Sequence, residues 1–171
     1  MTASRLLSLD DVPEMTELVT ANREFLAPWS PIRPESFFTE DGQRAVVADA
    51  LDHYEAGSIV PHVILDDAGR LAGRITLNEI ARGPFLSCRV GYWVAAGVNG
   101  RGLASAALAN LKRVAFEDLG LHRIEAGTLV HNERSQRVLL RNGFARIGLA
   151  PRYLSIAGQW QDHLLFQVLS E

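Results

Sequence analysis

Three closely spaced glycines, Gly97, Gly100 and Gly102, follow an expected strand that ends at Val94 and precede an Ala/Leu-rich stretch with helical spacing. The first turn of a helix carries main-chain N–H groups without partners and a partial positive charge. Glycines remove the Cβ atoms that would keep a bulky anion away from these groups, and Arg101 adds a positive charge. The segment is therefore suited to bind a phosphate or pyrophosphate, although an ordinary glycine-rich connection would show the same spacing.

This segment lacks the signatures of the two most common nucleotide-binding loops. A P-loop requires Lys followed by Ser or Thr after its glycines, and a Rossmann loop requires G-x-G-x-x-G with an acidic residue on a following strand. Neither pattern is present here. The sequence thus indicates a phosphate-binding loop of a different kind.

The other chemically capable residues form no familiar catalytic or metal-binding pattern. The 5 histidines have no metal-ligand spacing, no G-x-S-x-G occurs, and Cys88 is the one cysteine, so we expect no metal site and a small buried thiol. Asp162 and His163 could steer a proton, but neighbouring strand residues face opposite sides, which favours a structural role. Trp29 and Trp160 could line a substrate cleft or pack in the core.

An alternating series of strands and helices would position these residues. Turn residues and changes of hydrophobic period indicate the order β-α-α-β-β-β-α-β-α-β-β, with an antiparallel meander in the middle and a hairpin at the end. The prolines between residues 28 and 34 predict a loop after the first helix. The expected strands cover about 5–9, 59–65, 71–80, 87–94, 123–130, 144–156 and 160–169, and the expected helices about 13–25, 40–56, 103–119 and 133–142. This order predicts one α/β or α+β domain over residues 1–171 whose central strands are mixed in direction.

Composition limits the class of protein. The chain has 171 residues, 47% hydrophobic and 22% charged, which is typical of one folded domain that buries roughly 70% of its unfolded surface. The net charge is -3, from 17 basic and 20 acidic residues, which argues against generic nucleic-acid binding. No apolar stretch reaches membrane-spanning length. We therefore expect a soluble cytoplasmic protein, a monomer or homodimer, without nucleic-acid or membrane partners.

Three segments resemble motifs of the GNAT N-acetyltransferases. The first, Asn99 to Ala104 (N-G-R-G-L-A), resembles their acetyl-CoA loop, Q/R-x-x-G-x-G/A, with Asn in place of Gln or Arg. The second, Val90 to Val94, is similar to the strand that pairs with pantetheine. The third, Asn132 to Ser135, resembles the N-x-x-S helix cap, and Asn142 to Phe144 resembles the Gly-Phe stop of that helix.

Two further segments narrow the resemblance. Arg82 to Phe85 and Tyr153 to His163 are similar to the RimJ/RimL branch, which acetylates N-terminal amines of ribosomal proteins. The resemblance covers roughly residues 66–169 and implies the GNAT fold, a mixed, mostly antiparallel central sheet with helices on both faces. It also implies acetyl-CoA as co-substrate and a protein N-terminal amine as the acceptor.

The resemblance assigns residues to the cofactor as well. Main-chain amides of 98–104 would hold the pyrophosphate, and the pantetheine would lie along 93–95 like an added strand. A main-chain N–H near 92–94 would polarise the thioester carbonyl. The residues expected to bind the cofactor are Trp93, Val94, Ala95, Val98, Asn99, Gly100, Arg101, Gly102, Leu103, Ala104 and Asn132.

The catalytic residues are less completely assigned. The resemblance makes Ser135 the group that protonates the leaving thiolate, although a plain helix cap also explains this serine. Many family members carry a glutamate where Cys88 and Arg89 stand here, and a common tyrosine falls on Leu139. Glu79, near the end of the preceding strand, is the nearest acidic candidate for a base, unless strand alternation directs it to solvent.

Because the glutamate that many family members carry is missing here, we expect an acceptor amine that is already partly deprotonated at neutral pH. An α-amino group has a pKa near 7.7–8.0, so on the order of 10% is neutral at neutral pH, against roughly 0.04% of a lysine side chain. The difference corresponds to about 3–4 kcal/mol that a weak-base enzyme need not supply. We therefore expect direct attack of a protein N-terminal amine on the thioester. Acetylation of a small amine or antibiotic, and a non-catalytic acetyl-CoA sensor, are the alternatives.

Overall fold

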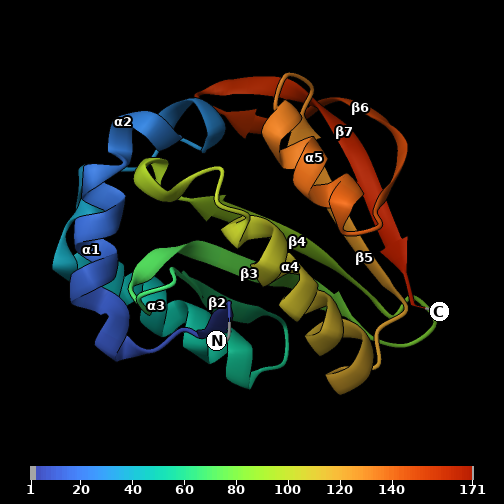
Figure 1. Cartoon of the computed structure of the whole chain (residues 1–171), viewed down its shortest axis with the longest axis horizontal. Coiled ribbons are helices and arrows are strands. Elements are labelled where there is room, and N and C mark those ends of the chain that lie inside the picture. The colour runs from blue at the N-terminus through green and yellow to red at the C-terminus, as the bar shows by residue number, and fades with distance from the viewer. Residues whose placement is uncertain (1–2, 171) are drawn as a thin grey trace.

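A seven-stranded sheet forms the centre of the molecule, with strand order β1-β2-β3-β4-β5-β7-β6 (Figure 1). This computed structural model describes residues 3–170. The strands are β1 (Ser4–Leu6), β2 (Val60–Leu65), β3 (Leu71–Ala81), β4 (Ser87–Val94), β5 (Arg123–Leu129), β6 (Ala145–Ile156) and β7 (Gln159–Leu169). The helices are α1 (Val12–Ala21), α2 (Arg23–Leu26), α3 (Glu40–Glu55), α4 (Leu103–Arg113) and α5 (Glu133–Arg141). The predicted element order, the central meander and the terminal hairpin are confirmed.

One pair of neighbouring strands differs from all the others in the sheet. β4 and β5 are parallel, whereas the other neighbours are antiparallel. A parallel pair needs a crossover connection, which α4 supplies. β4 and β5 pair only through Ser87–Arg89 and Arg123–Glu125. Both strands continue beyond this pairing, to Val94 and Leu129, so they diverge and a gap opens in the sheet.

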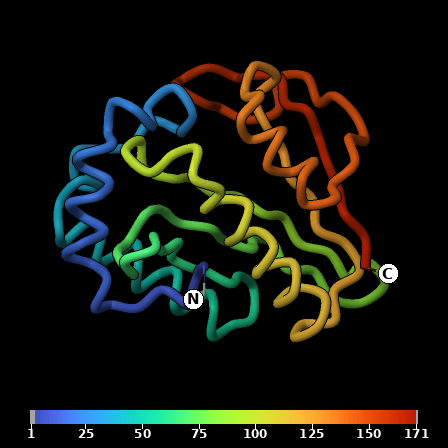
Figure 2. Tube along the Cα trace, in the orientation of Figure 1, coloured from blue at the N-terminus to red at the C-terminus, as the bar shows by residue number. Residues whose placement is uncertain are grey.

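Helices cover both faces of the sheet, which confirms the predicted layers. One apolar cluster joins the sheet to α4 and α5 through residues such as Leu108 and Leu139, and a second joins it to α1 and α3 through residues such as Val47. On β2, Ile64 belongs to the first cluster and its neighbour Val63 to the second, as strand alternation requires. The Cα trace shows α4 crossing in front of the strands (Figure 2). Within residues 3–170, no helix combines the length and apolarity needed to cross a membrane.

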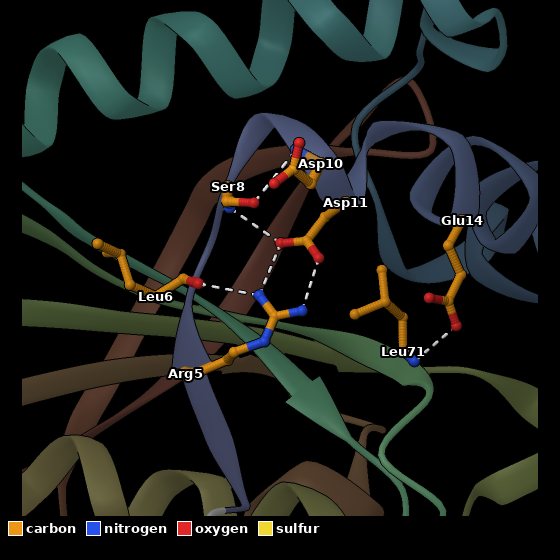
Figure 3. Close-up of polar contacts among 7 residues, drawn as sticks. All are labelled: Arg5, Leu6, Ser8, Asp10, Asp11, Glu14 and Leu71. Carbon is orange, nitrogen blue, oxygen red and sulfur yellow. Dashed lines mark hydrogen bonds and ion pairs between the residues drawn. The ribbon is translucent and has the colours of Figure 1, made fainter.

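An ion pair between the exposed Arg5 and the buried Asp11 fixes the corner between β1 and α1 (Figure 3). Arg5 donates from Nη1 and Nη2 to both carboxylate oxygens of Asp11, at 2.9 and 2.7 Å, and the Ser8 N–H donates to the same group at 2.9 Å. Burial raises the pKa of Asp11, but the hydrogen bonds from Arg5 and Ser8 outweigh it and hold that pKa below its usual value. One turn later, Glu14 accepts from the Leu71 N–H at 2.8 Å. These contacts anchor α1 beside the start of β3.

The first helix is shorter than predicted. It was expected to run to about Phe25, but α1 ends at Ala21 and the short α2 follows. The Asn22 side chain explains the break, because its amide donates to the Leu18 carbonyl at 2.8 Å and its oxygen accepts from the Ala96 N–H at 2.8 Å. Asn22 thereby ties the end of α1 to the segment that precedes α4.

The helix expected to reach Leu119 is α-helical only to Arg113. The chain then forms a π-helical turn over Val114–Asp118, in which the Leu119 N–H bonds to the Val114 carbonyl at 2.9 Å. Ala115, within this turn, and Leu121, after it, are both buried in the core. The Leu121 N–H donates to the Ala115 carbonyl at 2.9 Å. The wider π-helical turn therefore keeps the apolar residues of this segment in the core, as their spacing in the sequence predicted.

Candidate active site

The gap between β4 and β5 opens into a cavity of about 660 Å³, here called the central cavity. Residues 90–93 of β4 and 126–129 of β5 line its two sides. Further walls come from α3, β3, the proline-rich segment after α2 and the terminal hairpin. The divergence of two strands thus creates a chamber that reaches from the sheet to its surrounding loops.

The proline-rich segment and the terminal hairpin meet at the outer end of this chamber. The Ala157 N–H, in the hairpin turn, donates to the Ser30 carbonyl at 2.9 Å. Figure 2 shows the two segments side by side at the top of the trace. Trp29 lines the central cavity, with its ring centroid 5.5 Å from that of His131. Trp160 is 62% exposed and lines neither this cavity nor the next one.

A second cavity, of about 470 Å³, runs between the end of β4 and the first turns of α4 and α5, and is here called the α5 cavity. Its lining includes Asn99 and Ala104 at the glycine-rich loop and Val138 on α5. The two cavities share Leu26, Trp29, Tyr92, Trp93, Asn132 and Ser135. They therefore meet where β4 faces the first turn of α5.

The loop before α4 presents unused main-chain donors. Gly100 and Gly102 each have φ of 81°, the left-handed region that glycine tolerates, and a Cβ at either position would meet nothing within 4 Å. The Gly100 N–H is bonded to Asn99 Oδ1 at 3.0 Å. Within the described part of the chain, the N–H groups of 101–104 have no acceptor. Free amides at a helix start, with open space before them, suit the diphosphate of coenzyme A.

The exposed edge of β4 offers a second set of main-chain groups. The Ala95 N–H bonds to the Ala72 carbonyl of β3 at 2.8 Å, and β4 and β3 are antiparallel. Because such bonds alternate along a strand, the main-chain groups of Tyr92 and Val94 point the other way, toward β5. β5 does not pair with them, since its pairing to β4 stops at Arg89. This edge can accept an extended ligand as an added strand.

The predicted cofactor residues lie around this edge and loop, with different degrees of access. Trp93, Val94, Asn99, Ala104 and Asn132 line the α5 cavity. Three loop residues, Gly100, Arg101 and Gly102, are exposed. The other three face inward: Val98 and Leu103 pack against the core, and Ala95 is buried with its N–H and carbonyl already bonded.

A tyrosine that the sequence did not single out for its side chain contacts Ser135. The Tyr92 hydroxyl lies 2.9 Å from Ser135 Oγ and donates to the Ser135 carbonyl at 3.2 Å. Burial raises the pKa of Tyr92 to about 12, so its hydroxyl carries a proton at neutral pH. Strand alternation on β4 could have placed this side chain opposite α5, where a buried tyrosine hydroxyl needs a partner.

Asn132 performs the capping role that the sequence allowed for it. Its Oδ1 accepts from the Ser135 N–H at 3.2 Å, so it caps α5. The Ser135 hydroxyl is left free of that cap and faces Tyr92. The helix cap therefore orients Ser135 without using its side chain.

Glu79 lies beside the central cavity, not within it. It occupies a bulge of β3 with φ of 52°, its side chain is 70% exposed, and Oε2 lies 3.7 Å from Arg89 Nη1. Arg89 also donates to the Tyr153 hydroxyl. A smaller cavity, lined by Glu79 and Arg89, shares Gly91 with the central cavity. The carboxylate thus lines a cavity that adjoins the chamber along β3 and β4.

The predicted placements of the Asp162–His163 pair and of Cys88 agree with the structure. Asp162 is exposed and accepts from the Arg152 N–H at 2.8 Å, whereas His163 is buried and lines the central cavity, so the adjacent pair does not interact. Cys88 is buried, which, with the negative charge of Glu125, raises the pKa of its thiol to about 12. Among the residues the structure describes, no three His, Cys, Asp or Glu side chains gather as metal ligands would.

Comparison with known proteins agrees with this architecture. The family described as "Acetyltransferase (GNAT) domain" matches residues 4–145. The [ribosomal protein uS5]-alanine N-acetyltransferase of Escherichia coli is 34% identical over 162 residues, which cover 94% of this chain and 84% of that protein. The crystal structure of the ribosomal-protein-S5-alanine acetyltransferase from Vibrio fischeri superposes with a TM-score of 0.93 at 30% identity and covers 98% of this chain and 92% of that one.

A ligand-bound structure is similar to the same extent. Mycobacterium smegmatis RimJ in complex with CoA-disulfide has a TM-score of 0.93 and 30% identity, with 98% of this chain and 81% of that chain covered. The predicted family resemblance, fold and cofactor are therefore confirmed. The chain belongs to the GNAT acetyltransferases and is an acetyl-CoA-dependent N-acetyltransferase.

Proposed function

We propose that this enzyme transfers the acetyl group to the α-amine at the N-terminus of a protein in the cytoplasm. The observation that carries the proposal is the meeting of two cavities at Tyr92 and Ser135, one beside the amide-rich loop and the other open to the outside through the sheet. Relatives named for the alanine of a ribosomal protein support a protein acceptor. A chamber of about 660 Å³ has room for the first residues of an extended chain.

The cofactor would be held mainly by main-chain groups of this chain. The free amides of 101–104 bind the diphosphate, and the β4 edge at Tyr92 and Val94 binds the pantetheine amides. Acetyl-CoA supplies the activated acyl group. A β4 N–H that points into the gap polarises the thioester carbonyl, and the fixed geometry holds the two reactants together.

Proton transfer would use the contact between α5 and β4. Ser135 Oγ donates a proton to the leaving thiolate, and the Tyr92 hydroxyl, 2.9 Å away, passes a proton to Ser135 Oγ and regains one from solvent in the cavities, so that both hydroxyls end the cycle protonated. The acceptor amine needs little help, because an α-amine is partly neutral near pH 7. Glu79, in the adjoining cavity, accepts the amine proton through solvent. These roles follow from the position of each group along the path from the α5 cavity to the outside.

Replacing Gly102 with valine is expected to weaken cofactor binding. A branched side chain would fill the open space before the loop amides, and the φ of 81° would strain it. We expect the KM for acetyl-CoA to rise by roughly tenfold or more, through lost hydrogen bonds to a charged group. Gly69→Val is the matched control, because Gly69 has φ of 78° and open space but lies in the β2–β3 turn. An unchanged KM in folded Gly102→Val would contradict the placement.

Removing either hydroxyl of the Tyr92–Ser135 pair is expected to slow chemistry. Loss of a general acid costs on the order of 10²-fold in kcat, which we expect for Ser135→Ala, and a smaller loss is expected for Tyr92→Phe. The KM for acetyl-CoA should change by less than about threefold, because neither hydroxyl is assigned to cofactor binding. Steady-state kinetics of both variants check this, with Tyr54→Phe on the exposed face of α3 as control. Normal kcat in both variants would remove the pair from the mechanism.

An acceptor panel tests the proposed function itself. Thiol release from acetyl-CoA would be measured with Ala-first and Ser-first peptides, with the same peptides blocked at the N-terminus and carrying a lysine, and with polyamines and amino sugars. We expect the free N-termini to give the highest kcat/KM. A preference for lysine or for a small amine would overturn the proposed acceptor, and cofactor binding without any turnover would indicate a sensor.

A further inference from the structure

Among residues 3–170, Arg74 has no anionic partner for its charge inside the central cavity. It lies on β3, lines that cavity and is only partly accessible. Its Nε is buried and has no hydrogen-bond partner, and no carboxylate of residues 3–170 forms an ion pair with it. By contrast, Arg5 is paired with Asp11 at 2.7 Å. An unmatched guanidinium in a partly buried position is costly unless a ligand completes it.

A second cation lines the same chamber. Arg33, from the proline-rich segment, stacks over the Phe37 ring at 4.8 Å and faces the central cavity. Burial, and then the positive charge of Arg33, lower the pKa of Arg74. Asp49, on α3, also lines the cavity, and its carboxylate lies 3.6 Å from His53 Nδ1. Among the described residues that line this cavity, two guanidinium groups therefore face one carboxylate, and that carboxylate forms no ion pair with Arg74.

The cofactor does not supply the missing anion. Its phosphates belong to the loop before α4, whereas Arg74 and Arg33 are absent from the lining of the α5 cavity. The acetyl and pantetheine ends of the cofactor are uncharged. An anion beside Arg74 must therefore come from the acceptor that enters the central cavity.

Resting on the proposed function, we propose that Arg74, together with Arg33, binds an acidic side chain within the first four residues of the peptide whose α-amine is acetylated. Arg74 pairs in register with Trp93, the neighbour of Tyr92, and Arg74 and Tyr92 both line the central cavity, so one acceptor in this cavity can contact both groups. An extended peptide advances about 3.3 Å per residue, so only the first few residues of the acceptor lie near the reaction point, and these are the residues that Arg74 can select. A guanidinium binds a carboxylate through two parallel hydrogen bonds, which selects acidic over amide side chains.

Matched peptides test this specificity. Ala-first peptides would carry Glu at position 2, 3 or 4 and, in a parallel set, Gln at the same position, and kcat/KM would be measured for each. We expect one Glu position to exceed its Gln counterpart by roughly tenfold or more, mostly through KM, and the ratio to fall in high salt. In Arg74→Gln the ratio should fall to about one, and Arg74→Lys should keep part of it. Arg146→Gln, an exposed arginine of β6 outside both cavities, should keep the full ratio.

The outcomes separate the inference from the function on which it rests. Equal kcat/KM for Glu and Gln peptides at all three positions in the wild-type enzyme would overturn the inference and leave N-terminal acetylation standing. A Glu preference that survives in Arg74→Gln would overturn the role of Arg74. If no peptide is acetylated while small amines are, the proposed function fails and takes the inference with it. The wild-type comparison decides the first point even if a variant does not fold.

Discussion

The parallel pairing of β4 and β5 stops after Arg89, and the rest of the site depends on this short contact. If the two strands stayed paired to Val94, their main-chain groups would satisfy each other and the central cavity would be closed by the sheet. Because they diverge, the edge of β4 is free to bind an extended ligand on one side, and an acceptor can approach from the other. The α4 crossover that parallel strands require also places the glycine-rich loop at the end of β4. Cofactor loop, binding edge and reaction point are thus consequences of one topological feature.

Polar groups that hold the fold together have hydrogen-bond partners within the protein, whereas several polar groups around the two cavities have none among the described residues. At the β1–α1 corner, Arg5 and Asp11 complete each other, and Asn22 uses both ends of its side-chain amide to join α1 to the segment before α4. Around the two cavities, the amides of 101–104 and the Nε of Arg74 lack partners among the described residues. Unsatisfied groups cost stability, so their concentration in one place marks where ligands bind.

The sequence predicted the order of elements and the cofactor loop because both rest on local signals. Glycine spacing, caps and hydrophobic period depend on neighbours in the chain, and Gly102 as the N-cap of α4 agrees with them. Contacts between distant segments could not be obtained in this way. Nothing near Tyr92 in the sequence indicates Ser135, and the break at Asn22 depends on a partner 74 residues away. The exposed position of Glu79 follows from a bulge that shifts the alternation of β3, which no periodic pattern reveals.

The most direct test is a crystal structure of the protein with bound coenzyme A. The account predicts diphosphate oxygens within hydrogen-bond distance of the main-chain nitrogens of 101–104, the pantetheine along β4, and the sulfur beside Ser135 Oγ. A coenzyme A molecule lodged elsewhere, with these amides facing solvent and the edge of β4 bare, would contradict it.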